Sequence, residues 1–182
     1  MVTTTRMSLE DFLALPDIDE RRLELIDGEV CEKMSPRWGH SRLAGILCRL
    51  LEEHGYAGVE PRAIIARQGN RNPSSPLPDV AYYRNEPPAE EEWMTRPPNV
   101  AVEIVSPGQS HAEMRAKVDL YLAFGVESVW VIDARRSLVD VYEPESRRTL
   151  SGTDTLQSAA VPGFSLSVED LFAMLRRKKQ GS

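Results

Sequence analysis

Residues 99–107 read Asn99-Val100-Ala101-Val102-Glu103-Ile104-Val105-Ser106-Pro107, the most apolar run of the chain. A short apolar run that is rich in β-branched residues and closed by Ser-Pro predicts a strand buried on both faces. Glu103 is the only carboxylate in this run. An ionised carboxylate in such a place needs a partner or a metal ion, because unpaired burial is costly. Glu103 is therefore the first candidate for a functional residue.

The segments around this strand predict an α/β fold with a mixed central β-sheet flanked by helices. An additional N-terminal β-hairpin is expected over 22–34, with Asp27-Gly28 as its tight turn. The remaining elements are expected as helices over 8–15, 40–53 (stopped by Gly55), 110–124 (ended by Gly125) and 167–178, and as strands over 59–66, 78–83, 129–133 and 138–142, with a strand turn over 149–161. Residues 1–182 are expected to form one domain.

Composition and charge exclude some classes of function. The chain has 182 residues and a net charge of −6. This charge argues against sequence-independent coating of nucleic acid, which depends on phosphate neutralisation, but not against an enzyme with a local basic rim. No apolar stretch approaches the roughly 20 residues that cross a membrane. The first residues lack the apolar segment of a signal peptide, so we expect a cytoplasmic protein with no membrane association.

Lys117 is the second charge in an apolar setting. Helical spacing places it among Met114, Leu120 and Tyr121, on the side of the predicted helix opposite Arg115. One interpretation is a lysine at the helix edge whose stem packs while its ammonium reaches water. The other is a contact with Glu103, because a helix that directly follows a strand packs back over the sheet. Such a contact is explained equally well by a structural salt bridge.

Asp79 opens the predicted strand 78–83, directly after Pro78. It is either a turn-capping residue or the second carboxylate of a site on neighbouring strands. Two carboxylates beside a lysine suit Mg²⁺, which takes one or two carboxylates and leaves room for waters and a substrate phosphate. The lysine would then orient a water or neutralise developing charge.

Pro78-Asp79, Glu103 on the next strand and Lys117 resemble the PD-(D/E)xK nuclease superfamily. More specifically, the chain is similar to the Uma-type family of restriction-endonuclease-like proteins. Most of the chain carries this resemblance, in the segments 24–29, 34–36 with His40, 78–80, 102–107, 117 with 121, 125–127 and 130–133. The superfamily's usual lysine lies two residues after the acid, where this chain has Val105. The resemblance therefore assigns that role to Lys117, a lysine supplied from the following helix.

The resemblance implies a restriction-endonuclease-like core and further site residues. Glu24 would contact a water at the metal, and His40 would assist proton transfer or bind phosphate. The alternatives are that Glu24 forms the polar face of the hairpin and that His40 caps its helix. Glu113 either orients Lys117 or forms an ordinary pair with it along the helix. Phosphate contacts are predicted for arginines in or beside the strand and loop that lead to Asp79, or just after it: Arg62, Arg67, Arg71 and Arg84.

Three functions are compatible with these residues. The leading hypothesis is an endonuclease that hydrolyses DNA phosphodiester bonds with Mg²⁺, or Mn²⁺ as a substitute, held by Asp79 and Glu103. The second is a catalytically silent nuclease fold kept as a binding or scaffold protein. The third is a metal hydrolase that acts on a small phosphorylated substrate. A homodimer is expected, with Trp38 and Trp93 as candidates for a dimer surface or a lid.

Overall fold

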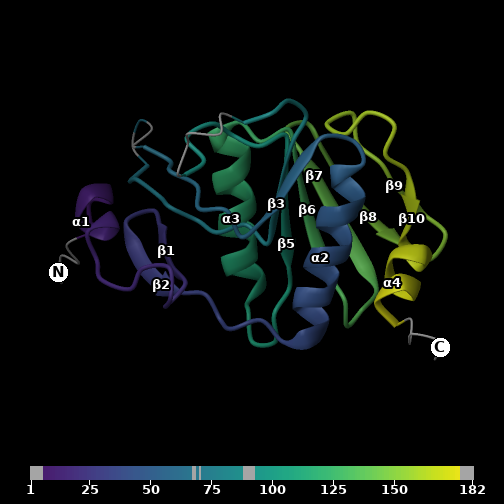
Figure 1. The fold of residues 1–182 in the computed structure, drawn as a ribbon, viewed down its shortest axis with the longest axis horizontal. Helices are drawn as coiled ribbons and strands as arrows, with labels where there is room; N and C mark the ends of the chain where they lie inside the picture. The colour runs from purple at the N-terminus through teal and green to yellow at the C-terminus, as the bar shows by residue number, and fades with distance from the viewer. Residues whose placement is uncertain (1–5, 67–68, 70, 88–92, 177–182) are drawn as a thin grey trace.

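The computed structural model of the protein describes residues 6–66, 69, 71–87 and 93–176 (Figure 1). Its helices are α1 (Leu9–Leu13), α2 (Trp38–Glu52), α3 (His111–Phe124) and α4 (Val168–Arg176). Its strands are β1 (Leu23–Ile26), β2 (Glu29–Glu32), β3 (Tyr56–Val59), β4 (Val80–Tyr83), β5 (Val100–Ile104), β6 (Ser128–Asp133), β7 (Leu138–Glu143), β8 (Ser146–Ser151), β9 (Thr155–Leu156) and β10 (Leu166–Ser167).

The central sheet has six strands in the order β3-β4-β5-β6-β7-β8. Strands β5 and β6 are parallel because α3 connects them, whereas the other neighbours are antiparallel. The hairpin β1-β2 and the pair β9-β10 form two small separate sheets. The predicted α/β class, the mixed sheet and the N-terminal hairpin are thus confirmed.

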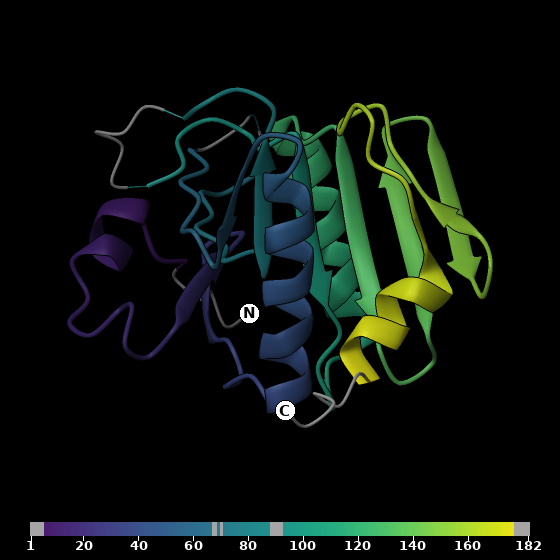
Figure 2. The ribbon, with the colours of Figure 1, turned by 45° about the vertical axis from the view of Figure 1, so that its right-hand side comes forward.

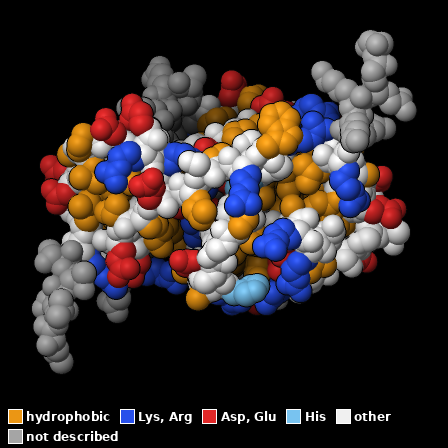
Figure 3. Space-filling model, turned by 90° about the horizontal axis from the view of Figure 1, so that it is seen from below, with side chains coloured by type: hydrophobic (Ala, Val, Ile, Leu, Met, Phe, Trp, Pro, Cys, Tyr) orange, Lys and Arg blue, Asp and Glu red, His pale blue; other side chains and the backbone are white. Residues whose placement is uncertain are grey.

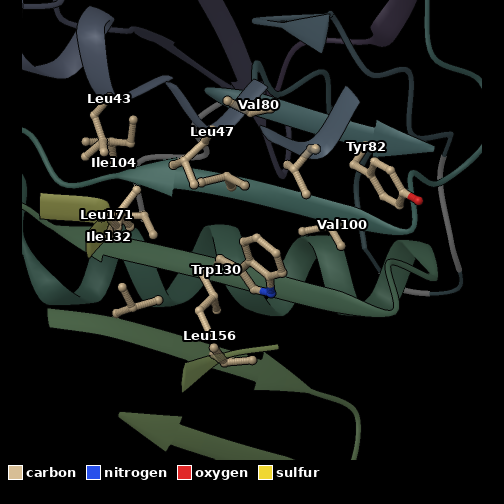
Figure 4. Packing of buried hydrophobic residues seen from close by; sticks show 14 of the residues in the cluster. Leu43, Leu47, Val80, Tyr82, Val100, Ile104, Trp130, Ile132, Leu156 and Leu171 are labelled. Atoms are coloured by element: carbon tan, nitrogen blue, oxygen red, sulfur yellow. The ribbon is translucent and has the colours of Figure 1, made fainter. Parts of the chain in front are cut away.

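The two faces of the sheet are covered by different helices, as Figures 1 and 2 show. Successive residues of a strand point to opposite faces. In β5, Val102 and its i±2 neighbours therefore pack with Leu47 of α2 and Leu171 of α4 in the larger core (Figure 4). Ala101 lies on the other face, in a cluster with Val118 of α3. Glu103 shares this face with Ala101, which directs its carboxylate toward α3.

The residues around α3 fix where this helix begins and ends. Ser110 accepts a hydrogen bond from the backbone of Glu113, and the Glu113 carboxylate accepts one from the backbone of Ser110, which forms a capping box. Gly125 ends the helix with φ 108°, in the left-handed region. A Cβ there would also lie 3.3 Å from the Pro97 side chain. Because Glu113 is used in the cap, it is not paired with Lys117.

Two predicted elements differ from the structure. The strand expected over 59–66 is instead β3, which ends at Val59 because Glu60 has φ 50° and Pro61 lacks an N–H donor. Gly55 does not stop α2, which ends at Glu52. Its role is close packing, since a Cβ there would lie 2.6 Å from the Tyr83 carbonyl oxygen. The last two residues of the helix expected over 167–178 lie outside the described residues.

The helices in the described part of the chain are all too short or too polar to cross a membrane.

Candidate functional site

The register of β4 and β5 brings the two predicted carboxylates together. Val80 pairs with Val102, and the backbone N–H of Asp79 donates to the Val102 carbonyl at 2.9 Å. The next position along this antiparallel register sets Asp79 opposite Glu103, on the sheet face that α3 covers. Both side chains are almost completely buried, each with 1% of its surface exposed.

Lys117 reaches Glu103 from α3, which is the second of the two arrangements that the sequence left open. Its ammonium lies 3.3 Å from both carboxylate oxygens of Glu103, and the residue is buried. Tyr121, one turn further along α3, donates its hydroxyl hydrogen to Oε1 of Glu103 at 2.7 Å. The carboxylate is therefore held in a fixed orientation by two donors from the same helix.

Glu24 joins the group from the hairpin β1-β2. Its Oε1 accepts hydrogen bonds from the Lys117 ammonium and from the backbone N–H of Leu77, both at 2.8 Å. The hairpin is held in place by backbone hydrogen bonds between Leu25 and Ser75 in both directions. Glu24 thus connects three parts of the structure: the hairpin, the loop that precedes Asp79, and Lys117 of α3.

Asp79 has a different set of partners. Its Oδ2 accepts the backbone N–H of Ile104 at 2.6 Å. Its Oδ1 lies 3.0 Å from Nε2 of His40, near the start of α2, and 2.6 Å from the ammonium of Lys33, just after β2. Nδ1 of His40 in turn lies 3.5 Å from the Ser106 hydroxyl.

The surroundings shift the pKa of Asp79, Glu103 and Lys117 in definite directions. Burial alone would raise the pKa of Asp79, but the hydrogen bond with His40 and the charge of Lys33 outweigh it and lower the pKa to about 2. Burial raises the pKa of Glu103 against the opposing charge of Lys117. Burial disfavours the Lys117 ammonium, yet the charges of Glu103 and Glu24 outweigh it and raise the pKa of Lys117. The cluster therefore keeps Asp79 ionised and Lys117 protonated at neutral pH.

These polar groups line a cavity of about 390 Å³ that also contacts the hairpin and the loop between β5 and α3. Met34, on the rim of the cavity, is 57% exposed, and Trp38, the first residue of α2, is 80% exposed. Figure 3 shows the molecule from below, the end at which α2 and α3 begin in Figure 1. Lys and Arg side chains gather near the middle of this face, whereas Asp and Glu side chains lie mostly toward its two ends.

The donor set suits a hard divalent cation. Asp79 and Glu103 offer oxygen ligands from adjacent strand positions to one cavity. In the described residues, no group of three or more His, Cys, Asp and Glu side chains is arranged as a preformed metal cage. Mg²⁺ does not require one, because it binds through one or two carboxylates and completes its shell with waters and substrate oxygens. Asp79 and Glu103 are thus the residues that would hold it.

None of the predicted arginines that the structure describes lines the cavity. Arg62 is buried, and its guanidinium donates to the Asp19 carboxylate at 2.8 Å and to the Leu23 carbonyl at 2.9 Å, so it ties the N-terminal segment together. Arg84 follows β4 at the end opposite Asp79 and pairs with Glu127 at 2.9 Å. Arg71 is exposed but does not line the cavity, and Arg67 lies outside the described residues.

Sequence reasoning placed Tyr121 beside Lys117 but gave it no role, and it missed Lys33 entirely. The Tyr121 contact follows from helix geometry, since residues i and i+4 share a face. Lys33 has no comparable signal, because it stands in the polar run Cys31-Glu32-Lys33 after an exposed strand. Its burial depends on how the hairpin folds over the cavity.

The lowered pKa of Asp79 predicts how stability depends on pH. A carboxyl group whose pKa is lowered by folding stabilises the native state above its unfolded pKa of 3.8, and this contribution is lost as the pH falls through about 2. We expect the stability difference between wild type and Asp79→Asn to shrink by about 2 kcal/mol as the pH falls from about 6 to about 2. Urea unfolding over this pH range measures it. A stability difference between the two proteins that does not change with pH would contradict the lowered pKa of Asp79.

Comparisons with known proteins identify the family and support the fold. A crystal structure described as "a putative nuclease belonging to DUF820 from Anabaena variabilis ATCC 29413" is similar, with a TM-score of 0.80 and 25% sequence identity. The match covers 93% of this chain and 99% of that chain. A comparison with curated proteins gave no significant match. The model of the Uma2 family, described as "Putative restriction endonuclease", matches residues 9–169, so the chain belongs to this family.

Proposed function

We propose that the protein is a Mg²⁺-dependent endonuclease that hydrolyses DNA phosphodiester bonds with Asp79, Glu103 and Lys117. The observation that carries the proposal is the convergence of these three buried side chains on one open cavity. Membership of a restriction-endonuclease family and a solved neighbour described as a nuclease support the same class of reaction.

Each residue has a role that follows from its contacts. When bound, Mg²⁺ would neutralise charge at the scissile phosphate and make an attacking water more acidic. Lys117, held between Glu24 and Glu103, is positioned to orient that water and to balance the charge that develops on the phosphate. Water adds to phosphorus, the bond from phosphorus to the leaving oxygen breaks, and the leaving oxygen takes up a proton. His40, which contacts Oδ1 of Asp79, would move such a proton.

The charge of the cluster also favours this reaction. With its carboxyl groups ionised, the cluster combines the three carboxylates Glu24, Asp79 and Glu103 with the two ammonium groups of Lys33 and Lys117. Its formal charge is then −1, which attracts a divalent cation and repels a phosphodiester. A bound Mg²⁺ reverses the sign, so nucleic acid is attracted only once the metal is present. This order of binding lets an acidic protein act on DNA.

One observation favours a second function, a catalytically silent nuclease fold that acts as a binding or scaffold protein, as a homodimer. Each of the two metal-ligand carboxylates already contacts an ammonium group of the protein, Lys33 at Asp79 and Lys117 at Glu103. A fold that no longer binds metal would keep such pairs for stability.

Metal titration distinguishes the two functions. We expect calorimetry with MnCl₂ to detect binding by the wild type that Asp79→Asn weakens by at least about 10-fold, because a direct ligand loses its charge. Asp119→Asn removes a carboxylate from the exposed face of α3 and serves as the matched control. The same proteins are then tested on supercoiled plasmid and on single-stranded RNA. Absence of Mn²⁺ binding and of plasmid cleavage by the wild type would overturn the endonuclease in favour of the scaffold.

A further inference from the structure

Lys33 is a charge in the cavity wall that the proposed reaction does not use. It follows β2, and its side chain is only 10% exposed. Its ammonium lies 2.6 Å from Oδ1 of Asp79, donates to the carbonyl of Leu77 at 2.6 Å and lies 3.7 Å from Oε1 of Glu60. These contacts bring a positive charge from the hairpin to the floor of the cavity.

The position of Lys33 matters because of how Asp79 is held. Its Oδ2 is occupied by the backbone N–H of Ile104, which is a fixed part of β5. Oδ1 has no backbone donor and is the atom that contacts Lys33, so a cation at Oδ1 would share this oxygen with the ammonium. An ammonium and a divalent ion on one oxygen would repel each other strongly in a site with little water. Cation binding at Oδ1 of Asp79 and the contact with Lys33 therefore oppose each other.

Lys33 has two further partners besides Asp79. Its side chain is a flexible stem with a compact charge. The Leu77 carbonyl and the Glu60 carboxylate are both within reach of the ammonium in its present position. His40 remains on Asp79 independently of Lys33, from α2 rather than from the hairpin. The ammonium can therefore leave Asp79 without leaving its other partners and without disrupting the rest of the cluster.

We propose that Lys33 is a built-in counter-cation, which occupies the cavity-facing oxygen of Asp79 in the metal-free protein and is displaced when a divalent cation binds. The proposal rests on the proposed metal site at Asp79 and Glu103. Lys33 stabilises the empty site, because it compensates a buried carboxylate, and it lowers the affinity for metal by the same contact. It is a positioning residue and not a metal ligand.

Removal of the charge tests the proposal. In Lys33→Met the stem remains and the ammonium is lost, so we expect Mn²⁺ to bind about 10-fold more tightly than to the wild type in calorimetry. In EDTA the variant is expected to melt at a lower temperature than the wild type, and saturating MnCl₂ narrows this difference. Lys33→Gln, which keeps an N–H donor for the Leu77 carbonyl, is expected to tighten binding in the same way and serves if Lys33→Met folds poorly.

The matched control is Arg49→Met, which removes the same unit of charge from the exposed face of α2, outside the cavity. Its Mn²⁺ affinity is expected to equal that of the wild type, which separates a local effect from one of net charge. If the wild type binds Mn²⁺ and neither Lys33 variant binds more tightly, the counter-cation is refuted while the metal site stands. If neither the wild type nor the variants bind Mn²⁺, the metal site itself is refuted, and the counter-cation with it.

Discussion

Lys117→Met is expected to lower the rate of plasmid cleavage by about 10²–10³-fold while Mn²⁺ binding is retained. The ammonium of Lys117 has no oxygen of Asp79 among its contacts and touches Glu103 at 3.3 Å, so its loss frees metal-ligand oxygens and does not remove them. What disappears is the positive charge that positions water and balances the transition state. Turnover therefore falls, whereas metal affinity does not fall.

The experiment measures single-turnover cleavage of supercoiled plasmid at saturating MnCl₂, with calorimetry on the same samples. Arg115→Met is the matched control, because it removes a cation two residues earlier on the exposed face of α3, where it pairs with Asp119. The control is expected to cleave at the rate of the wild type. Cleavage by Lys117→Met at that rate would refute the role of this lysine.

Loss of Lys117 also leaves Glu24 and Glu103 buried beside each other without a cation, which destabilises the fold. The double variant Glu24→Gln with Lys117→Met removes one of the two carboxylates and is expected to recover part of the lost stability. It remains inactive if the lysine is required for the reaction. Low activity in a well-folded double variant therefore cannot be ascribed to unfolding.

The contact between Glu103 and Lys117 could be predicted because it depends on the patterns of two elements that follow each other in the sequence, a strand and a helix. An apolar strand fixes which residues are buried, and the helix that follows it must return over the same sheet. The period of α3 then selects Lys117 as the polar side chain on the covered face. Asp79 was predicted as a strand-opening residue, although its position opposite Glu103 depends on the register of β4 and β5.

The remaining parts of the site depend on contacts between distant segments. In β1, Leu23, Glu24 and Leu25 are all buried, so the alternation expected of a half-exposed hairpin fails. The alternation fails because the face of β1 that carries Glu24 lies against Lys117. Arg62 is a second such case: nothing near it in the sequence indicates that its buried side chain pairs with the exposed carboxylate of Asp19, 43 residues away.

Glu24 is expected to have the second largest effect, on stability. Glu24→Ala removes the acceptor for the buried Leu77 N–H and one of the two carboxylates on Lys117, so we expect the free energy of unfolding to fall by about 3–5 kcal/mol. Glu24→Gln keeps an oxygen that accepts from Leu77 and loses only the charge, so a smaller loss is expected. Glu29→Ala, in the exposed strand β2, is the control and is expected to change stability by less than about 0.5 kcal/mol.

Urea unfolding measures these differences, and calorimetry with MnCl₂ separates two roles for Glu24. If it acts through Lys117, as the 2.8 Å contact indicates, Glu24→Gln leaves Mn²⁺ affinity close to that of the wild type and slows cleavage. If Glu24 instead contacts a water at the metal, the same variant weakens Mn²⁺ binding. A loss of stability in Glu24→Ala no larger than that in Glu29→Ala would mean that the hairpin is not fastened to the sheet through this carboxylate. Lys117 would then be positioned by Glu103 and not by the hairpin.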